Sequence, residues 1–264
     1  MPYRETRIYS GAMMEIERTH CTALGKSLIR RSRGLPTGKA QAKINLKNAR
    51  RRLMRLMCAN FTRGDYHITL TFAESVSREA AGKELAKALR KLRGECRRAG
   101  AGDMRYICVR EDRGVRPHYH LVCGAFEITL AKLQEIWPHG RVEMGTLDGN
   151  PDYGWLARYL TKQEEQDKGR KRWSQSKNLA EPYSPPAKIL KRKALASRPA
   201  VPKGYYVMSA YRQATGQGYE WEYIIAIRQD RLQELPVEIQ LRLEQSKTWG
   251  EFADYESTHS DTWH

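Results

Sequence analysis

The sequence lacks the paired cysteines of a zinc ribbon or a disulfide framework. Its five cysteines are odd in number, lie far apart and never form a C-x-x-C pair. This pattern favours a reducing compartment, and we therefore expect a cytoplasmic protein. Cys108 and Cys123 fall within predicted strands, where we expect them to be small buried hydrophobic residues.

The sequence also lacks a long apolar run and a nucleotide-binding loop. No stretch is apolar enough to span a bilayer, and the start has no hydrophobic signal-peptide core, so we expect no membrane anchor. Gly25-Lys26-Ser27 resembles the end of a phosphate-binding loop, but His20 stands where that motif needs its first glycine. We therefore predict no nucleotide-driven motor in this chain.

Acidic residues are scarce beside basic ones. The 264 residues include 47 Lys and Arg against 30 Asp and Glu, which gives a net charge of +17. A chain this basic is expected to bind a polyanion, with nucleic acid as the first expectation and a membrane surface as the second. Hydrophobic residues make up 40% of the chain, enough for one good core and a smaller second one.

Basic residues are densest between residues 26 and 57, a stretch with eleven Lys or Arg and no acid. From Lys39 onward the spacing of apolar residues predicts a helix, with its apolar stripe at Ile44, Ala49, Leu53 and Leu56. The basic side of this helix carries Arg50, Arg51, Arg52 and Arg55. That side is either a solvated charged face or a phosphate-contacting one, and the lack of balancing acids favours phosphate contact.

The middle of the chain alternates predicted strands and helices. His67–Phe72 alternates apolar and polar residues as a strand does, and the apolar spacing over residues 77–98 predicts a helix. Strands follow at residues 104–111 and 117–124, joined by a turn at residues 112–114. A short helix capped by Thr129, a strand at residues 140–145, and a helix capped by Asn150 or Asp152 that runs to about Glu165 complete the series.

This order is β-α-β-β-α-β followed by a helix. It predicts the α+β class and the ferredoxin-like split βαβ arrangement, an antiparallel sheet with both helices on one face. We expect the other face of the sheet to be left open. The same sheet is an RNA-binding platform in other proteins, so the fold alone does not decide the function.

The flanks predict a hairpin at residues 3–20, a basic proline-rich extended segment at 166–203, a hairpin at 204–228 and a helix at 230–246. We expect the two hairpins to pair. The chain is therefore divided into an N-terminal hairpin and basic helix (1–60), a central domain (61–165), a basic linker (166–203), and a C-terminal hairpin, helix and tail (204–264).

Two histidines in the second strand of the predicted central hairpin indicate a metal site. Because strand side chains alternate, His118 and His120 lie on one face and Tyr119 on the other. The short turn makes Glu111 of the preceding strand a neighbour that can supply a third ligand. Two imidazoles and a carboxylate suit Mn²⁺, Mg²⁺ or another divalent ion. Two unrelated surface histidines and a strand-end carboxylate are the alternative.

A tyrosine and a lysine on the last predicted helix of this region form the other half of a site. Tyr159 and Lys162 are three residues apart and share a helix face, whereas Leu156 and Leu160 share another. A tyrosine beside a metal-bound phosphate can act as a nucleophile, and a lysine can hold the phosphate. Considered singly, Tyr159 could equally pack on the sheet and Lys162 could be a solvated cation.

Together these residues resemble the HUH endonuclease family, the rolling-circle replication initiators and their relatives. Three family motifs appear in the expected order within about residues 66–165, namely His67–Phe72, His118-Tyr119-His120 and Tyr159-x-x-Lys162. The resemblance implies a sequence-specific single-strand nickase that forms a 5′-phosphotyrosine link and leaves a 3′-hydroxyl. It also implies that Glu111, His118 and His120 hold the metal ion.

The sequence departs from some relatives in having one tyrosine on this helix. Where those relatives carry another tyrosine four residues earlier, this chain has Trp155, so the resemblance implies a single-tyrosine enzyme. Tyr153, six residues before Tyr159, lies on another helix face and is a poor second nucleophile. We expect DNA to contact the four arginines of the basic helix together with Thr69, Thr71, Arg116 and Arg158.

Partners follow from the same resemblance. We expect single-stranded or hairpin origin DNA, a host helicase and a host polymerase, in a bacterial host cell or an equivalent DNA-containing compartment. A mobilisation relaxase or a transposase of the same chemistry is the nearest alternative. A non-catalytic nucleic-acid-binding module would use exposed aromatic residues on the sheet, where this chain offers His, Thr and Glu. A structural basic protein would explain the charge but not the three motifs.

Overall fold

A computed structural model of the chain describes residues 2–21, 38–111, 116–162, 171–191, 194–214 and 219–245. Several predicted features lie outside these residues: the Gly25-Lys26-Ser27 loop, the turn at 112–114, Arg192 and Lys193 of the basic linker, and the C-terminal tail. The described chain forms two compact units, one of residues 60–180 and one of residues 1–59 with 181–264. The predicted division into four segments stays a prediction.

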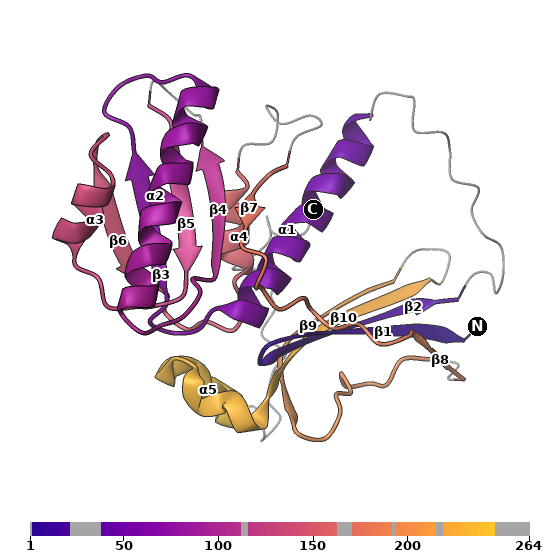
Figure 1. The fold of residues 1–264 in the computed structure, drawn as a ribbon. Coiled ribbons are helices and arrows are strands. Elements are labelled where there is room, and N and C mark those ends of the chain that lie inside the picture. Colours follow the sequence, from indigo (N-terminus) through magenta and orange to yellow (C-terminus); the bar gives the residue numbers. More distant parts are fainter. Residues whose placement is uncertain are drawn as a thin grey trace. The chain divides into compact units, whose positions relative to one another are not determined.

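The unit of residues 60–180 contains the predicted α+β fold. Its sheet has the order β6-β3-β5-β4-β7, and every neighbouring pair is antiparallel. The elements follow the predicted order: β3 (Tyr66–Thr71), α2 (Arg78–Arg98), β4 (Tyr106–Glu111), β5 (His118–Cys123), α3 (Leu130–Ile136) and β6 (Val142–Thr146). The short fifth strand β7 (Ser174–Gln175) pairs with β4 in a segment that was predicted to be extended. Figure 1 shows α2 lying against the sheet and running roughly along its strands.

One face of this sheet is closed by α2 and α3. The core joins Ile68 and Leu70 of β3 to Leu89 and Leu92 of α2 and Leu133 of α3. Both helices begin where the sequence predicts, because the side-chain oxygens of Ser77 and Thr129 accept backbone N–H groups of the first helical turns. The predicted helix at residues 77–98 is therefore confirmed, and so is the burial of Cys108 and Cys123.

The opposite face of the sheet is less open than predicted. Helix α4 (Gly154–Leu160) lies beside it, since the rings of Tyr159 and His120 are in contact. This helix is shorter than the predicted one at both ends. The Asp152 carboxylate accepts the N–H of Gly154 at its start, and the Thr161 hydroxyl donates to the Ala157 carbonyl at its end.

The other unit is built on a second five-stranded antiparallel sheet of order β8-β1-β2-β10-β9. Its strands are β1 (Tyr3–Ser10), β2 (Met13–His20), β8 (Lys188–Leu190), β9 (Tyr205–Ala214) and β10 (Glu220–Arg228). The two predicted hairpins do pair, through β2 and β10, so segments about 200 residues apart in sequence share one sheet. The glycine-containing turn that the sequence predicts within the 204–228 hairpin, at Gly216 and Gly218, lies outside the described residues.

The basic helix of this unit is α1 (Lys39–Asn60). Its buried side differs from the predicted stripe, because Ile44 is half exposed while Leu46, Met54 and Met57 are buried together with the predicted Leu53 and Leu56. The buried stripe is thus shifted around the helix and is richer in methionine than the pattern suggested. The buried side begins at Leu46, and the side chains of residues 41–45 are exposed.

The predicted C-terminal helix is two elements. A 3₁₀ helix, η1 (Gln229–Glu234), precedes α5 (Val237–Gln245). Pro236 separates them, since a proline disfavours helical backbone in the residue before it, and Leu235 is extended. Within the described ranges, no helix is both long and apolar enough to cross a membrane.

Candidate active site

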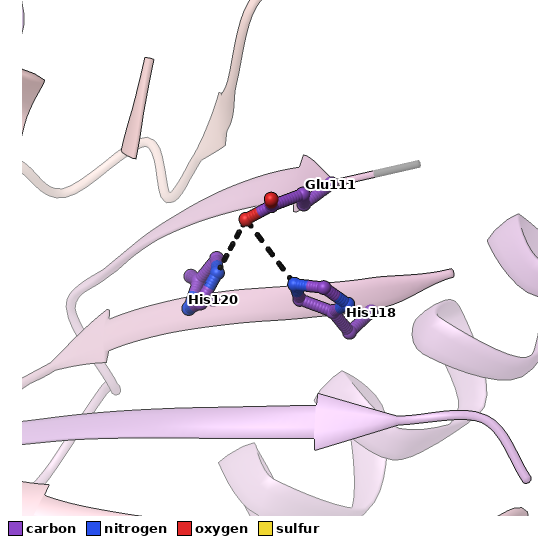
Figure 2. Close-up of side chains that lie close together, drawn as sticks. All are labelled: Glu111, His118 and His120. Atoms are coloured by element: carbon purple, nitrogen blue, oxygen red, sulfur yellow. Dashed lines mark hydrogen bonds and ion pairs between the residues drawn. The ribbon is translucent and has the colours of Figure 1, made fainter. Parts of the chain in front are cut away.

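The register of β4 and β5 brings three potential metal ligands together. Glu111, the last residue of β4, pairs with His118, the first residue of β5. His120 lies two residues further along β5 and therefore points to the same face. Figure 2 shows the Glu111 carboxylate directed at both imidazoles. The sequence-predicted trio is thus assembled by one hairpin.

One oxygen of Glu111 faces both histidines. Its Oε2 lies 3.2 Å from Nε2 of His118 and 3.1 Å from Nε2 of His120. The three ligand atoms lie within 4.8 Å of one another. Among the described residues, this is the one group of His, Cys, Asp and Glu side chains close enough to hold a metal ion.

The electrostatics of the trio suit a cation. Burial lowers the pKa of the His120 imidazole to about 4, so that its ring is neutral at physiological pH. Burial raises the pKa of the Glu111 carboxyl, but hydrogen bonds from Lys162 and His120 lower it by more, and the group stays ionised. A carboxylate with two imidazoles is a donor set that divalent ions accept, so the residues present fit a metal ion.

Thr69 of β3 supports the His120 ring from the neighbouring strand. The two residues are paired in the sheet, and Oγ1 of Thr69 lies 3.3 Å from Nδ1 of His120. When Nε2 of a histidine binds a metal ion, the other ring nitrogen carries the proton and needs an acceptor. Thr69 was predicted as a DNA contact, and its observed contact is with this ring.

Lys162 lies against the same carboxylate. Its Nζ is 2.9 Å from Oε2 of Glu111, and its side chain is about one-third exposed. The ammonium group also lies 4.2 Å from the centroid of the Tyr159 ring, a cation–π distance. Lys162 follows the end of α4, and its N–H donates to the Tyr159 carbonyl. One lysine therefore contacts both the metal-ligand group and the predicted nucleophile.

Tyr159 lies on the strand-facing side of α4. Its ring meets the His120 ring edge-on, with centroids 5.3 Å apart, and its side chain is partly exposed. Leu156, Ala157 and Leu160 of the same helix are buried, which fixes the orientation of α4. Tyr153 is also buried, whereas Tyr159 is accessible. The geometry thus brings Tyr159 and Lys162 next to the metal-ligand group, as the sequence predicted.

Two aromatic side chains at this site were not assigned a role from the sequence. His67 stacks on His120 with ring centroids 5.4 Å apart, and burial lowers the pKa of its imidazole. Trp155 stacks on Tyr159 with centroids 5.6 Å apart and planes only 12° from parallel. Two sequence features could have pointed to them. The alternation of β3 places His67 on the face of Thr69, and Trp155 lies four residues before Tyr159 on a helix.

The remaining predicted DNA contacts are spread over both units. Thr71 pairs with His118 and shares its face, Arg116 is exposed just before β5, and Arg158 is half-buried on α4. The four arginines of α1 belong to the other unit. There, Nε and Nη2 of Arg55 donate to the two carboxylate oxygens of Glu15, at 2.5 and 2.9 Å, and Arg51 covers the ring of Tyr223. Contact of these side chains with DNA stays a prediction.

Comparison with known families gives one result. Residues 65–164 match the family model described as replication-associated protein ORF2/G2P. The matched segment begins at the residue before β3 and ends two residues after Lys162, so it contains the metal-ligand group, Tyr159 and Lys162. The match covers 100 of the 264 residues, and this segment is therefore similar to replication-associated proteins. Neither the comparison with curated proteins nor the comparison with solved structures gives a match.

Proposed function

We propose that this chain is a site-specific single-stranded DNA endonuclease and strand transferase that initiates rolling-circle replication. The observation that carries the proposal is that Tyr159 contacts both the metal-ligand group and Lys162. Its ring touches His120 of the metal-ligand group and lies under the ammonium of Lys162. The family match over the same residues supports DNA replication as the setting.

The reaction follows from these groups. The Tyr159 phenolate oxygen attacks a backbone phosphorus, a new P–O bond forms, and the bond to the 3′-oxygen breaks. The phenol loses one proton and the departing 3′-oxygen gains one, so the charges balance. The products are a 5′-phosphotyrosine and a 3′-hydroxyl. Because the new ester keeps the bond energy of the phosphodiester, a later 3′-hydroxyl can reverse the step without a nucleotide cofactor.

Each of these residues has its own role in the proposed reaction. The Lys162 ammonium lies next to the Tyr159 ring, where its positive charge can hold a phosphate oxygen of the DNA. Glu111, His118 and His120 would hold a divalent ion, Mn²⁺ or Mg²⁺, whose chemistry is to neutralise non-bridging phosphate oxygens. Thr69 fixes the His120 ring, and the Arg116 and Arg158 side chains are candidates to bind the DNA backbone.

The test is formation of a covalent adduct. A degenerate pool of single-stranded oligonucleotides labelled at the 3′ end is incubated with Mn²⁺ and the protein, then run on a denaturing gel. We expect a labelled protein band from the wild type and from Tyr153→Phe, but none from Tyr159→Phe. An adduct peptide that carries the DNA on a tyrosine other than Tyr159 would overturn the proposed nucleophile. Sequencing the oligonucleotides recovered from the covalent adduct identifies the recognised DNA.

A further inference from the structure

Trp155 is the most exposed large aromatic side chain at the site. Its side chain is 71% exposed, although Leu156 and Ala157, which follow it in α4, are buried. A tryptophan ring is large, flat and mostly apolar, so an exposed face of it can stack on another flat ring. The Trp155 ring stacks with one face on the Tyr159 ring.

The geometry of the stack defines the available surface. The two ring planes are within 12° of parallel and their centroids are 5.6 Å apart, so the rings are offset-stacked. One face of the indole is therefore turned to Tyr159 and the other to solvent. A flat ring added to the solvent face would continue the stack. The neighbouring groups are cationic, with Arg158 on the same helix and Lys162 over the Tyr159 ring.

We propose that Trp155 is a base-binding platform that stacks a nucleobase of the DNA strand next to the scissile phosphate. The proposal rests on the proposed function, because it needs single-stranded DNA to pass over Tyr159. The flat apolar face accepts a base, and the cationic groups beside it accept the backbone phosphates. The stack would set which phosphate reaches Tyr159, which makes Trp155 a positioning residue.

The proposal gives a reason for the position of Trp155 on α4, outside the sheet. On the sheet face at the site, the rings of His67 and His120 stack on each other, and Thr69 of β3 pairs with His120 of β5. The platform is instead on α4, one turn before the nucleophile. Stacking is tolerant of sequence, because every base has a flat face. Trp155 would therefore position the strand, while the choice of sequence falls to other contacts.

The test measures the binding of an oligonucleotide of about 12 thymidines, within the site sizes typical of single-strand-binding proteins. Fluorescence anisotropy is recorded in EDTA so that no cleavage occurs. We expect Trp155→Ala to weaken binding by about 5- to 150-fold, the range for losing one stacked base. Trp155→Phe, which keeps a flat ring, should bind within a few-fold of the wild type. Tyr183→Ala, which removes an exposed tyrosine of the other unit, is the matched control and should change little.

A second oligonucleotide, in which abasic sites replace the thymidines, separates stacking from an effect on the helix. It keeps the phosphates and removes the bases, so wild type and Trp155→Ala should bind it equally. An equal loss on both oligonucleotides would overturn the proposal, since Trp155 would then act by holding α4 in place. Unchanged binding of the thymidine strand by Trp155→Ala would also overturn it.

The experiments distinguish a failure of the Trp155 proposal from a failure of the proposed nickase function. If Trp155→Ala binds thymidines as the wild type does while the wild type still forms the Tyr159 adduct, the platform is wrong and the nickase stands. If Trp155→Ala loses binding to thymidines alone while no adduct forms on any sequence of the pool, the base site stands and the nickase is wrong.

Discussion

Lys162 and Glu111 form an ion pair at the centre of the site, with Nζ 2.9 Å from Oε2. The same carboxylate oxygen also faces Nε2 of His118 and of His120. The ammonium is thus a cation that balances the buried carboxylate. A metal ion bound to the same three ligands would lie close to that positive charge and would be repelled by it.

The first prediction is that Lys162 opposes metal binding while it supports catalysis. Lys162→Met should bind Mn²⁺ more tightly than the wild type by about 3- to 30-fold, because a partly exposed charge next to the ion is removed. The same variant should form little or no DNA adduct. Isothermal titration calorimetry without DNA measures the affinity, and the denaturing gel measures the adduct.

Lys132→Met is the matched control, because this lysine pairs with Glu135 on the surface of α3, outside the metal-ligand group. It should leave both measurements unchanged. Weaker Mn²⁺ binding in Lys162→Met would mean that the lysine helps to hold the metal ligands in place, and the proposed competition would be wrong.

The second prediction concerns the ligands. His118→Ala should weaken Mn²⁺ binding by at least about tenfold and stop metal-dependent cleavage, because one of three ligands is lost. DNA binding should remain, since the basic residues carry most of that affinity. His139→Ala removes a histidine that pairs with Glu84, outside the group, and should bind Mn²⁺ normally. Cleavage in excess EDTA equal to cleavage with Mn²⁺ would rule out the metal site.

The third prediction concerns the basic helix α1. Of the predicted set, Arg52 is exposed and the other three arginines are partly buried; Arg55 is held by Glu15 and Arg51 covers Tyr223. If α1 contacts single-stranded DNA, changing Arg50 and Arg52 together to Gln should flatten the log–log salt dependence of binding by about 0.7 for each lost phosphate contact. Anisotropy titrations over a range of salt concentrations give the slope.

Lys83→Gln with Lys87→Gln is the control for this experiment. Both lysines are exposed on α2 and pair with glutamates of that helix, so the double change removes the same amount of charge elsewhere. The slope should then stay close to that of the wild type. An equal flattening in both double variants would show that net charge matters and that α1 has no particular role in the DNA path.

The fourth prediction concerns the cysteines. Burial raises the pKa of the Cys108 thiol to about 12 and also raises that of Cys123, so both stay protonated at pH 8. Because the thiolate is the reactive form, neither should react with a thiol reagent in the folded protein. Of the five cysteines, Cys21 alone is partly exposed. One thiol should therefore react quickly, and Cys21→Ser should abolish that reaction.

The raised thiol pKa values also determine whether the free energy of unfolding rises or falls with pH. Unfolded thiols ionise near pH 9, whereas Cys108 ionises in the folded state only near pH 12. Between these values the unfolded state binds fewer protons, so the free energy of unfolding should fall as the pH rises through this window. Rapid labelling of Cys108 in the folded protein, with unchanged circular dichroism, would contradict the assigned burial.

Some features of this protein are fixed by local patterns in the sequence. Ser77 and Thr129 stand where helices start, and the alternation in β3 and β5 decides which side chains share a face. Since these patterns depend on neighbours a few residues apart, they could be read without a structure. The Glu111, His118 and His120 trio was predictable for the same reason, because a short hairpin fixes its register.

Other features needed the tertiary structure. The shift of the α1 stripe away from Ile44 depends on what the helix packs against, and the break at Pro236 divides a continuous apolar pattern. The ion pair of Lys162 with Glu111 and the open indole face of Trp155 arise where α4 lies beside β5. A helix and a strand far apart in sequence meet only through burial of the helix's apolar side, and no local pattern gives their distance or orientation.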